Sequence, residues 1–354
     1  MKKNFLITTG GSGGHVQPAM ILYEHLSKKA NITISTDKRG LRFLDKELYK
    51  FEIIDMPKLN NIFNLPYNLI RILYLTIRSF FLLKSKKIEK IFSTGGYMSL
   101  PLILASRLLK LKIYLIEPNH VLGRANRHFL NSCEKIFCYA KNLKNFPEIF
   151  KKKIVLINPL VKENVYKLSS SNKIKDKLTL LIVGGSQGAN IFDNNLKNSI
   201  VTISKKKNIK IIHQTNEKNI SDLSNFYSKN NVENKIFSFD KNLPTSIHQA
   251  DLCITRAGAS TLAELSVLNI PFIAVPLPTS KDNHQFENAK YYYDRDCCWI
   301  LNQSSFEKNI ENLLEDILIN KSIFLKKKEN LKKLNYQNTW INVNEKILKE
   351  INEN

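Results

Sequence analysis

Residues 5–15 read FLITTGGSGGH, a short apolar run that ends in a glycine-rich turn, and residues 181–189 repeat the pattern as LIVGGSQGA. Each turn is followed by a helical pattern, at Pro18–Lys29 and at Ala189–Lys206. Glycines let the backbone approach an anion closely, and the amides and dipole of a helix N-terminus then hold it. The two segments therefore predict one anion site in each half of the chain.

Short apolar or β-branched runs alternate with helical patterns along both halves. We expect strands at Asn4–Thr8, Asn31–Ser35, Ile91–Ser93, Lys112–Ile116, Lys135–Tyr139, Lys151–Ile157, Leu178–Val183, Ile209–His213, Lys235–Phe239, Leu252–Thr255 and Pro271–Val275. Such alternation predicts parallel sheets covered by helices on both faces. The fold class is therefore α/β, with two doubly wound Rossmann-like domains whose glycine turns face each other across a cleft. The domain boundary is expected between Asn158 and Lys177.

The composition narrows the possible partners. Of 354 residues 43% are hydrophobic, and 54 Lys and Arg against 31 Asp and Glu give a net charge of +23. This is too apolar for a disordered polycation, and the length suits about two domains of roughly 100–200 residues. Positive charge attracts nucleic acid, anionic lipid or phosphorylated substrates. Only nine basic residues are Arg, the side chain suited to bidentate base recognition, so nucleic acid is not an expected partner.

The localisation follows from cysteines and hydropathy. Five cysteines without a CxxC pair indicate a reducing compartment, and the apolar start is too short for a signal peptide. The most lipid-like stretch, Ile62–Leu83, is interrupted by Pro66, Arg71 and Arg78, so we do not expect it to span a membrane. It is either a core helix or a helix lying in an anionic headgroup layer, where Leu75 and Phe80 would contribute to binding.

A nicotinamide-dependent oxidoreductase is one competing hypothesis. Asp37 follows the second expected strand, where the ribose-binding acid of such enzymes lies. Neither glycine turn matches GxGxxG or the phosphate-binding loop GxxxxGK[ST], which weakens this alternative.

Six segments together resemble one family. They are Gly10–His15, Thr94–Tyr97, Glu117–Asn119, Gly184–Ala189, Arg256–Glu264 and Lys281–Ala289. Their order and spacing are similar to those of the MurG family, peripheral membrane N-acetylglucosaminyltransferases of peptidoglycan synthesis. The resemblance extends from Thr8 to about Ala289. The last sixty or so residues contain no motif that matches the family.

The resemblance implies a GT-B inverting glycosyltransferase at the cytoplasmic face of the bacterial inner membrane. It would transfer N-acetylglucosamine from UDP-GlcNAc to the C4 hydroxyl of the muramoyl sugar of lipid I (undecaprenyl-diphospho-muramoyl-pentapeptide), giving lipid II. Residues 1–160 would bind the acceptor and an anionic membrane surface, and residues 161–335 would bind the nucleotide sugar. A C-terminal helix at about 336–354 would pack on the first domain. The chemistry needs no metal and no cofactor, although a divalent cation that screens diphosphates remains open.

The resemblance also implies roles for particular residues. His15 is the expected general base, because a helix N-terminus disfavours its cationic form, and Glu117 is the alternative base. The acceptor-binding residues would be Ser12, Gly13, Gly14, Tyr97 and Asn119. The donor-binding residues would be Ser186, Gln187, Gly188, Asp240, Arg256, Ala259, Ser260, Thr261, Glu264 and Gln285. Among these, Glu264 would accept hydrogen bonds from both ribose hydroxyls, and Gln285 would recognise hydroxyls of the transferred sugar.

One departure from the family pattern affects donor selectivity. The family often has a second Gln before the position of Gln285, and this chain has His284 there. A related GT-B enzyme that glycosylates diacylglycerol therefore stays open as an alternative, because it would share the donor half.

Overall fold

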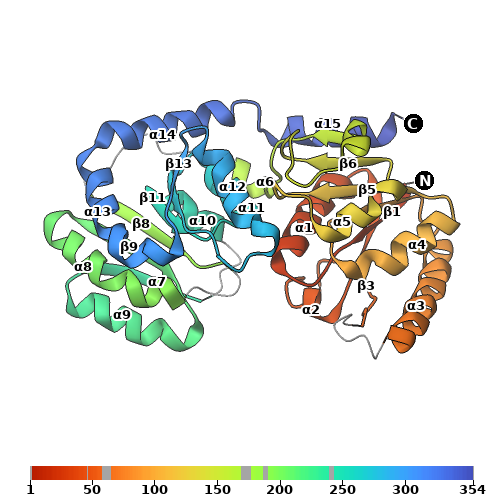
Figure 1. Ribbon diagram of the computed structural model, residues 1–354, viewed down its shortest axis with the longest axis horizontal. Helices are drawn as coiled ribbons and strands as arrows, with labels where there is room; N and C mark the ends of the chain where they lie inside the picture. The colour runs from red at the N-terminus through yellow and green to blue at the C-terminus, as the bar shows by residue number, and fades with distance from the viewer. Residues whose placement is uncertain are drawn as a thin grey trace. The chain divides into compact units, whose positions relative to one another are not determined.

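The computed structural model describes residues 2–45, 47–57, 65–168, 177–185, 190–238 and 243–353. The chain forms two compact units, one of Met1–Lys162 with Ile341–Asn354 and one of Glu163–Trp340 (Figure 1). The described parts of both units are parallel sheets with helices, so the predicted α/β class is confirmed.

The first unit is built on a seven-stranded parallel sheet with the order β3-β2-β1-β4-β5-β6-β7. Its strands are β1 (Lys3–Thr8), β2 (Ala30–Thr36), β3 (Phe51–Ile53), β4 (Lys90–Ser93), β5 (Lys112–Glu117), β6 (Lys135–Cys138) and β7 (Ile154–Leu156). Its helices are α1 (Gly13–Ser27), α2 (Lys38–Leu41), α3 (Leu65–Ser85), α4 (Leu100–Leu108) and α5 (Arg124–Phe129). The strand order reverses between β1 and β4, which is where ligands bind in open α/β sheets.

The C-terminal helix α15 (Trp340–Asn352) packs on this first sheet (Figure 1). Val343, Ile347 and Ile351 recur every four residues and are buried in one cluster with aromatic side chains of the sheet. Lys90, itself buried, donates a hydrogen bond to the carbonyl of Ile351, and Lys135 pairs with Glu350 at 2.9 Å. Apolar packing and a capped helix end therefore hold α15 to the first unit.

The second unit contains a six-stranded parallel sheet with the order β10-β9-β8-β11-β12-β13. Its strands are β8 (Leu178–Val183), β9 (Ile209–Gln214), β10 (Glu233–Phe237), β11 (Leu252–Thr255), β12 (Phe272–Ala274) and β13 (Cys298–Ile300). Its helices are α6 (Glu163–Tyr166), α7 (Asn190–Asn195), α8 (Lys197–Lys206), α9 (Ile220–Lys229), α10 (Leu243–Gln249), α11 (Ala259–Val267), α12 (His284–Tyr293), α13 (Phe306–Ile319) and α14 (Lys321–Leu334). Here the order reverses between β8 and β11.

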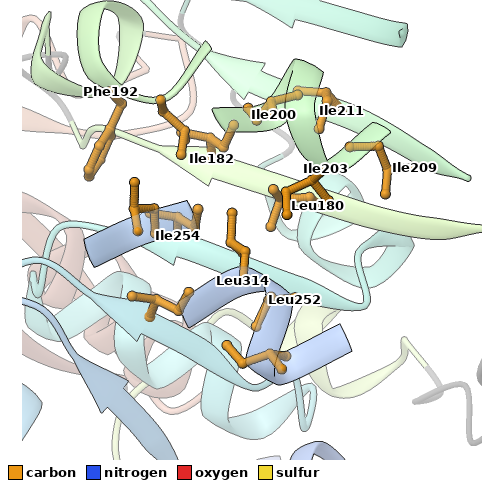
Figure 2. Close-up of a cluster of buried hydrophobic side chains, with 14 of the residues drawn as sticks. Leu180, Ile182, Phe192, Ile200, Ile203, Ile209, Ile211, Leu252, Ile254 and Leu314 are labelled. Atoms are coloured by element: carbon orange, nitrogen blue, oxygen red, sulfur yellow. The ribbon is translucent and has the colours of Figure 1, made fainter. Parts of the chain in front are cut away.

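Short 3₁₀ helices complete the two units. They are η2 (Tyr97–Ser99), η3 (Leu130–Ser132) and η4 (Glu148–Lys153) in the first, and η5 (Glu217–Asn219), η6 (Lys281–Asn283) and η7 (Gln303–Ser305) in the second. The core of the second unit joins strand side chains such as Leu180 and Ile254 to Phe192 and Ile200 from the helices that follow β8 (Figure 2).

The strands that were predicted wrongly all lie at sheet edges. The short strands β3 and β13 were not predicted at all, and β7 begins at Ile154 because the preceding residues form η4. Strand β10 begins at Glu233, two residues before its expected start, and the expected end at Phe239 lies outside the described residues. Edge strands pair on one side only and are often short, so their hydrophobic pattern is weak.

Two helix predictions also differ from the structure. Helix α1 begins at Gly13, well before Pro18, because Ser12 has the extended backbone of an N-cap and the glycines themselves form the first turn. The single helix expected over Ala189–Lys206 is two helices, α7 and α8, on either side of Leu196. The earlier start of α1 brings His15 into its first turn.

Helix α3 has a buried face and an exposed apolar face. Leu75, Ser79 and Leu83 recur every four residues and are buried. Large apolar side chains point to solvent at Tyr67, Leu69, Ile70, Leu73, Tyr74, Ile77 and Phe81. The expectation that Leu75 and Phe80 would contribute to lipid contact is therefore wrong, since Leu75 is 4% exposed and Phe80 is packed against the core.

A buried polar network joins α7 to strand β9 and to the residues that follow it. Asp193 of α7 accepts hydrogen bonds from Thr215 at 2.6 Å and Asn219 at 2.8 Å, and its other oxygen lies 3.2 Å from His213 Nε2. Burial lowers the pKa of His213. Burial would raise the pKa of Asp193, but the hydrogen bonds from His213, Thr215 and Asn219 lower it overall. The network thus favours a neutral imidazole beside a carboxylate.

This network predicts an acid-sensitive fold. Burial holds the pKa of His213 in the folded protein below its ordinary value of 6.5, so its contribution to stability is present above pH 6.5 and is lost as the pH falls below it. The free energy of unfolding should fall with acid by at most about 1.4 kcal/mol per pH unit from this group. Urea denaturation between pH 7 and 5 should show a smaller dependence in His213→Gln, which cannot titrate. The exposed control His128→Gln should keep the wild-type dependence, and equal curves for both variants would contradict the assignment.

Candidate active site

The residues expected at the acceptor site come from loops at the carboxyl edge of the first sheet. The glycine turn follows β1, and Thr94–Tyr97 follows the neighbouring strand β4. The loop after β5 carries Asn119. Parallel strands end at one edge, so these loops gather around the point where the strand order reverses.

His15 bridges the two loops at this point. Its Nδ1 lies 2.9 Å from the carbonyl oxygen of Thr94. A carbonyl oxygen can only accept, so Nδ1 carries the hydrogen and, in the neutral ring, Nε2 keeps an available lone pair. Gly95 makes room for the ring: it has φ +91, and a Cβ there would lie 3.3 Å from His15 Cε1. The structure therefore holds His15 in the tautomer that a general base requires.

Ser12, Gly13 and Gly14 form the start of α1. Ser12 is the N-cap with φ −127 and ψ 161, and its carbonyl accepts the amides of His15 and Val16. The first amides of a helix have no partner within it, and they give this end a partial positive charge. These residues thus have the backbone geometry of an anion site.

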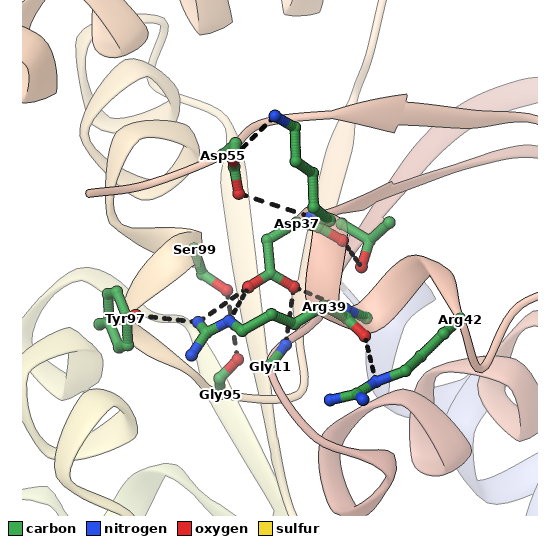
Figure 3. A network of polar contacts seen from close by, with 11 residues as sticks. Gly11, Asp37, Arg39, Arg42, Asp55, Gly95, Tyr97 and Ser99 are labelled. Atoms are coloured by element: carbon green, nitrogen blue, oxygen red, sulfur yellow. Dashed lines mark hydrogen bonds and ion pairs between the residues drawn. The ribbon is translucent and has the colours of Figure 1, made fainter. Parts of the chain in front are cut away.

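The carboxylate of Asp37 ties the glycine turn to α2 (Figure 3). Its Oδ1 accepts from the amides of Gly11 and Gly40, both at 2.8 Å, and its Oδ2 pairs with Arg39. The side chain is 2% exposed. Both oxygens are engaged inside the protein, so this carboxylate cannot receive ribose hydroxyls as the nicotinamide hypothesis required.

Tyr97 lies at the start of η2, directly after Gly96. Its hydroxyl oxygen accepts a hydrogen bond from Arg39 Nη2 at 2.8 Å. Tyr97 is therefore connected to the glycine turn through Asp37 and Arg39, although Arg39 lies 58 positions earlier in the sequence (Figure 3).

Glu117 is a buried carboxylate saturated with hydrogen bonds. Oε1 accepts from the backbone and side-chain amides of Asn119 at 3.2 and 3.0 Å. Oε2 accepts from the Gly123 amide at 2.8 Å and from Asn126 Nδ2 at 2.9 Å. The side chain thereby organises the loop after β5, and this engagement favours His15 over Glu117 as the group that receives a proton from substrate.

The residues expected to bind the donor, as far as the structure describes them, follow strands β11 and β12 of the second sheet. The backbone amide of Arg256, after β11, donates to the carbonyl of Val183 at the end of β8, at 3.2 Å. Gly185 has a positive φ of 78. Four expected donor residues, Ser186, Gln187, Gly188 and Asp240, lie outside the described residues.

Arg256 braces the strand ends of this edge. Its guanidinium donates to the carbonyl of Val275 at 3.1 Å and to Gln303 Oε1 at 2.6 Å, and it lies 5.4 Å from the ring centroid of Phe192. Burial lowers the pKa of Arg256 from 12.5, and an arginine remains cationic at neutral pH. Its contact with a donor phosphate stays a prediction.

Helix α11 begins next to Arg256. Gly258 is its N-cap, and Ala259, Ser260 and Thr261 form the first turn, so neither hydroxyl residue is the cap itself. Glu264 follows on the same helix and is half-buried. A partial positive charge and a nearby carboxylate suit a diphosphate and a ribose, respectively.

Gln285 lies in the first turn of α12 with its amide oriented. Its Oε1 accepts from the backbone amide of Leu277 at 3.0 Å, so the opposite end of the side-chain amide is the NH₂ group, which can only donate. Three residues later Asn288 donates to the carbonyl of Ala257 at 3.2 Å and joins α12 to the turn before α11. Glu264 and Gln285 therefore belong to adjoining helices of one edge.

Two site residues were missed by sequence reasoning. Arg39 was not singled out, although an Asp and an Arg two residues apart after a strand could have suggested a local pair. Asn126 was also missed, because its bond to Glu117 depends on the path of the loop between them.

Both units of the chain match one class of enzyme. Residues 5–138 match the Glycosyltransferase family 28 N-terminal domain, and residues 179–339 match the Glycosyltransferase family 28 C-terminal domain. A crystal structure of MurG from Acinetobacter baumannii superposes with a TM-score of 0.76 at 23% identity, covering 94% of this chain and 95% of that one. The chain thus has the GT-B fold of a family 28 glycosyltransferase.

Full-length relatives make the identification more specific. The chain is 47% identical to a protein of Pelagibacter ubique named UDP-N-acetylglucosamine--N-acetylmuramyl-(pentapeptide) pyrophosphoryl-undecaprenol N-acetylglucosamine transferase, with 100% of both chains covered. A Rickettsia felis protein of the same name is 33% identical, over 94% of this chain and 95% of its own. The chain belongs to the MurG family.

Replacing Glu117 by Gln should destabilise the first unit. The substitution puts an NH₂ group against N–H donors on one side, and an unsatisfied buried polar group costs about 1–3 kcal/mol. Thermal and urea unfolding would measure the loss. The exposed control Glu134→Gln should change stability by less than about 0.5 kcal/mol, and an equally small change in Glu117→Gln would show that its hydrogen bonds contribute little.

Proposed function

We propose that this protein transfers N-acetylglucosamine from UDP-GlcNAc to the C4 hydroxyl of the muramoyl sugar of lipid I, forming lipid II with inversion of the anomeric centre. The observation that carries the chemistry is the bond from His15 to the Thr94 carbonyl, which leaves Nε2 able to accept a proton. The names of the full-length relatives support the choice of donor and acceptor.

In this mechanism Nε2 of His15 removes the proton of the C4 hydroxyl as its oxygen attacks the anomeric carbon. The bond from that carbon to the diphosphate breaks at the same time, and UDP leaves with the electron pair. The amides at the start of α11, near Ser260 and Thr261, would stabilise the charge of UDP together with Arg256, a cation held in place just before this helix.

The remaining residues would bind the two substrates. Glu264 accepts from the ribose hydroxyls, and the NH₂ group of Gln285 donates to the transferred sugar. On the acceptor side, Ser12, Gly13 and Gly14 hold the lipid diphosphate, while Tyr97 and Asn119 contact the muramoyl sugar. The first compact unit is thus the acceptor domain and the second the UDP-sugar domain.

The two alternatives receive less support. Both carboxylate oxygens of Asp37 already have partners within the protein, which argues against a nicotinamide site that uses Asp37 to bind the ribose. The names of the relatives describe transfer to a muramoyl lipid and give no support to transfer to diacylglycerol. Labelled GlcNAc and a short-chain lipid I analogue test the proposal directly: no labelled disaccharide would reject it, and a preference for UDP-glucose with diacylglycerol would favour the other branch.

Removing the imidazole should slow the chemical step. We expect His15→Ala to lower kcat about 10²- to 10⁴-fold, the usual contribution of a general base, with little change in the KM for UDP-GlcNAc. Steady-state transfer kinetics measure both constants. The exposed His128→Ala serves as the matched control, and a kcat for His15→Ala within a few-fold of wild type would exclude His15 as the base.

We also propose that α3 binds the cytoplasmic membrane surface. Its exposed apolar side chains lie beside the exposed cations Arg71, Arg78 and Lys84, a combination that favours an anionic headgroup layer. Among the described helices, none is both long and apolar enough to cross a bilayer. A helix lying in the interface would bring the enzyme to its lipid substrate.

Vesicle binding tests this assignment. Leu73 and Phe81 are 61% and 64% exposed, and full burial of such side chains is worth roughly 1.5–3 kcal/mol each. We therefore expect Leu73→Ser/Phe81→Ser to weaken binding to phosphatidylglycerol vesicles by about tenfold or more, and added salt to weaken it further. The control Ile149→Ser removes an 81% exposed side chain on η4, and an equal loss in that variant would reject α3 as the contact.

A further inference from the structure

One polar connection near the acceptor loops has no part in the chemistry derived above. It runs from the glycine turn through Asp37 and Arg39 to Tyr97 (Figure 3). These residues follow three different strands, β1, β2 and β4, which are adjacent in the sheet. The connection therefore depends on the tertiary fold, and it ends on a residue expected to touch the acceptor.

The two oxygens of Asp37 have different partners, so Arg39 takes no part in supporting the glycine turn. Asp37 Oδ1 holds the amides of Gly11 and Gly40 without using Arg39. Asp37 Oδ2 holds Arg39 Nε and Nη2, each at 2.8 Å. Removing the guanidinium would leave both hydrogen bonds from these backbone amides in place, so the glycine turn does not need Arg39 to keep its shape.

What Arg39 adds is a fixed contact with Tyr97. Its planar guanidinium is held at two nitrogen atoms by Asp37, and Nη2 then donates to the Tyr97 hydroxyl at 2.8 Å. The guanidinium carbon also lies 5.4 Å from the centroid of the Tyr97 ring. The tyrosine is thereby restrained at its ring and at its oxygen.

This contact fixes the hydrogen-bonding direction of Tyr97. An arginine has no acceptor, so the tyrosine oxygen must accept in this pair, and its own hydrogen points elsewhere. A tyrosine held in this way presents an O–H donor to a ligand oxygen. Because this donor is already oriented, less side-chain conformational entropy is lost when a ligand binds to it.

We propose that Arg39 is a positioning residue for the acceptor: anchored by Asp37, it orients Tyr97 so that the phenolic O–H donates to an oxygen of the acceptor. This proposal rests on the transferase function proposed above and names a residue of its acceptor site. Lysine cannot replace the arginine, because one ammonium group does not reproduce the planar fork that spans Asp37 and Tyr97.

A double-mutant cycle with Tyr97→Phe tests the proposal by transfer to the short-chain lipid I analogue. We expect Arg39→Met and Tyr97→Phe each to raise the acceptor KM about tenfold, the effect of one lost hydrogen bond to a charged or oriented group. The KM for UDP-GlcNAc should change by less than about twofold, because the donor residues belong to the other unit. The double variant should resemble the worse single variant, since both changes break one connection.

Three controls separate positioning from a structural role. Arg42→Met removes a neighbouring exposed arginine. Its Nε donates to the backbone carbonyl of Arg39 and not to the Asp37 or Tyr97 side chains, so this variant should keep the wild-type acceptor KM. Thermal unfolding of every variant identifies losses due to folding. Arg39→Lys keeps the charge beside Asp37 and should still raise the acceptor KM, which provides a second reading should Arg39→Met fold poorly.

The outcomes are distinct. Independent, multiplicative effects of Arg39→Met and Tyr97→Phe, an equal rise in the donor KM, or a wild-type acceptor KM in Arg39→Lys would each overturn the positioning role. Absence of transfer by the wild-type protein would instead reject the proposed function itself.

Discussion

The hydrogen bond between His15 Nδ1 and the Thr94 carbonyl is the contact on which the first site depends. It joins the loops after β1 and β4, the adjacent strands between which the sheet order reverses. The same bond selects the imidazole tautomer, so one contact sets both the position and the chemistry of His15. It also explains Gly95, whose absent Cβ leaves room for the ring.

Buried carboxylates organise the loops around both sheets. Asp37 and Glu117 each receive hydrogen bonds on both oxygens. In the second unit, one oxygen of Asp193 accepts from Thr215 and Asn219, and the other lies beside His213. A buried carboxylate is stable only when such donors surround it, so each one fixes the path of the segments that supply them. Loops fixed in this way can hold functional side chains in place although the loops lie at the protein surface.

The sequence predicted the central strands better than the edge strands, and motif residues better than their supports. Buried strands such as β8 have continuous apolar runs, whereas β3 and β13 are three residues long. The position of Asp37 after β2 is visible in the sequence and kept the competing nicotinamide hypothesis open, whereas its hydrogen bonds to Gly11 and Arg39 are visible only in the structure. In α3 most positions are apolar, and only packing distinguishes buried Leu75 from exposed Leu73.

The sequence by itself determined the α/β class, the two glycine turns and the family, because periodicity, glycine spacing and motif order are properties of the chain. Tertiary structure decided which atoms of His15, Asp37, Glu117 and Gln285 are engaged, since their partners lie on other strands and loops. It also decided that Arg39 meets Tyr97 across 58 positions. Hydrogen bonds require atoms about 3 Å apart, and only the folded sheet brings these loops to that distance.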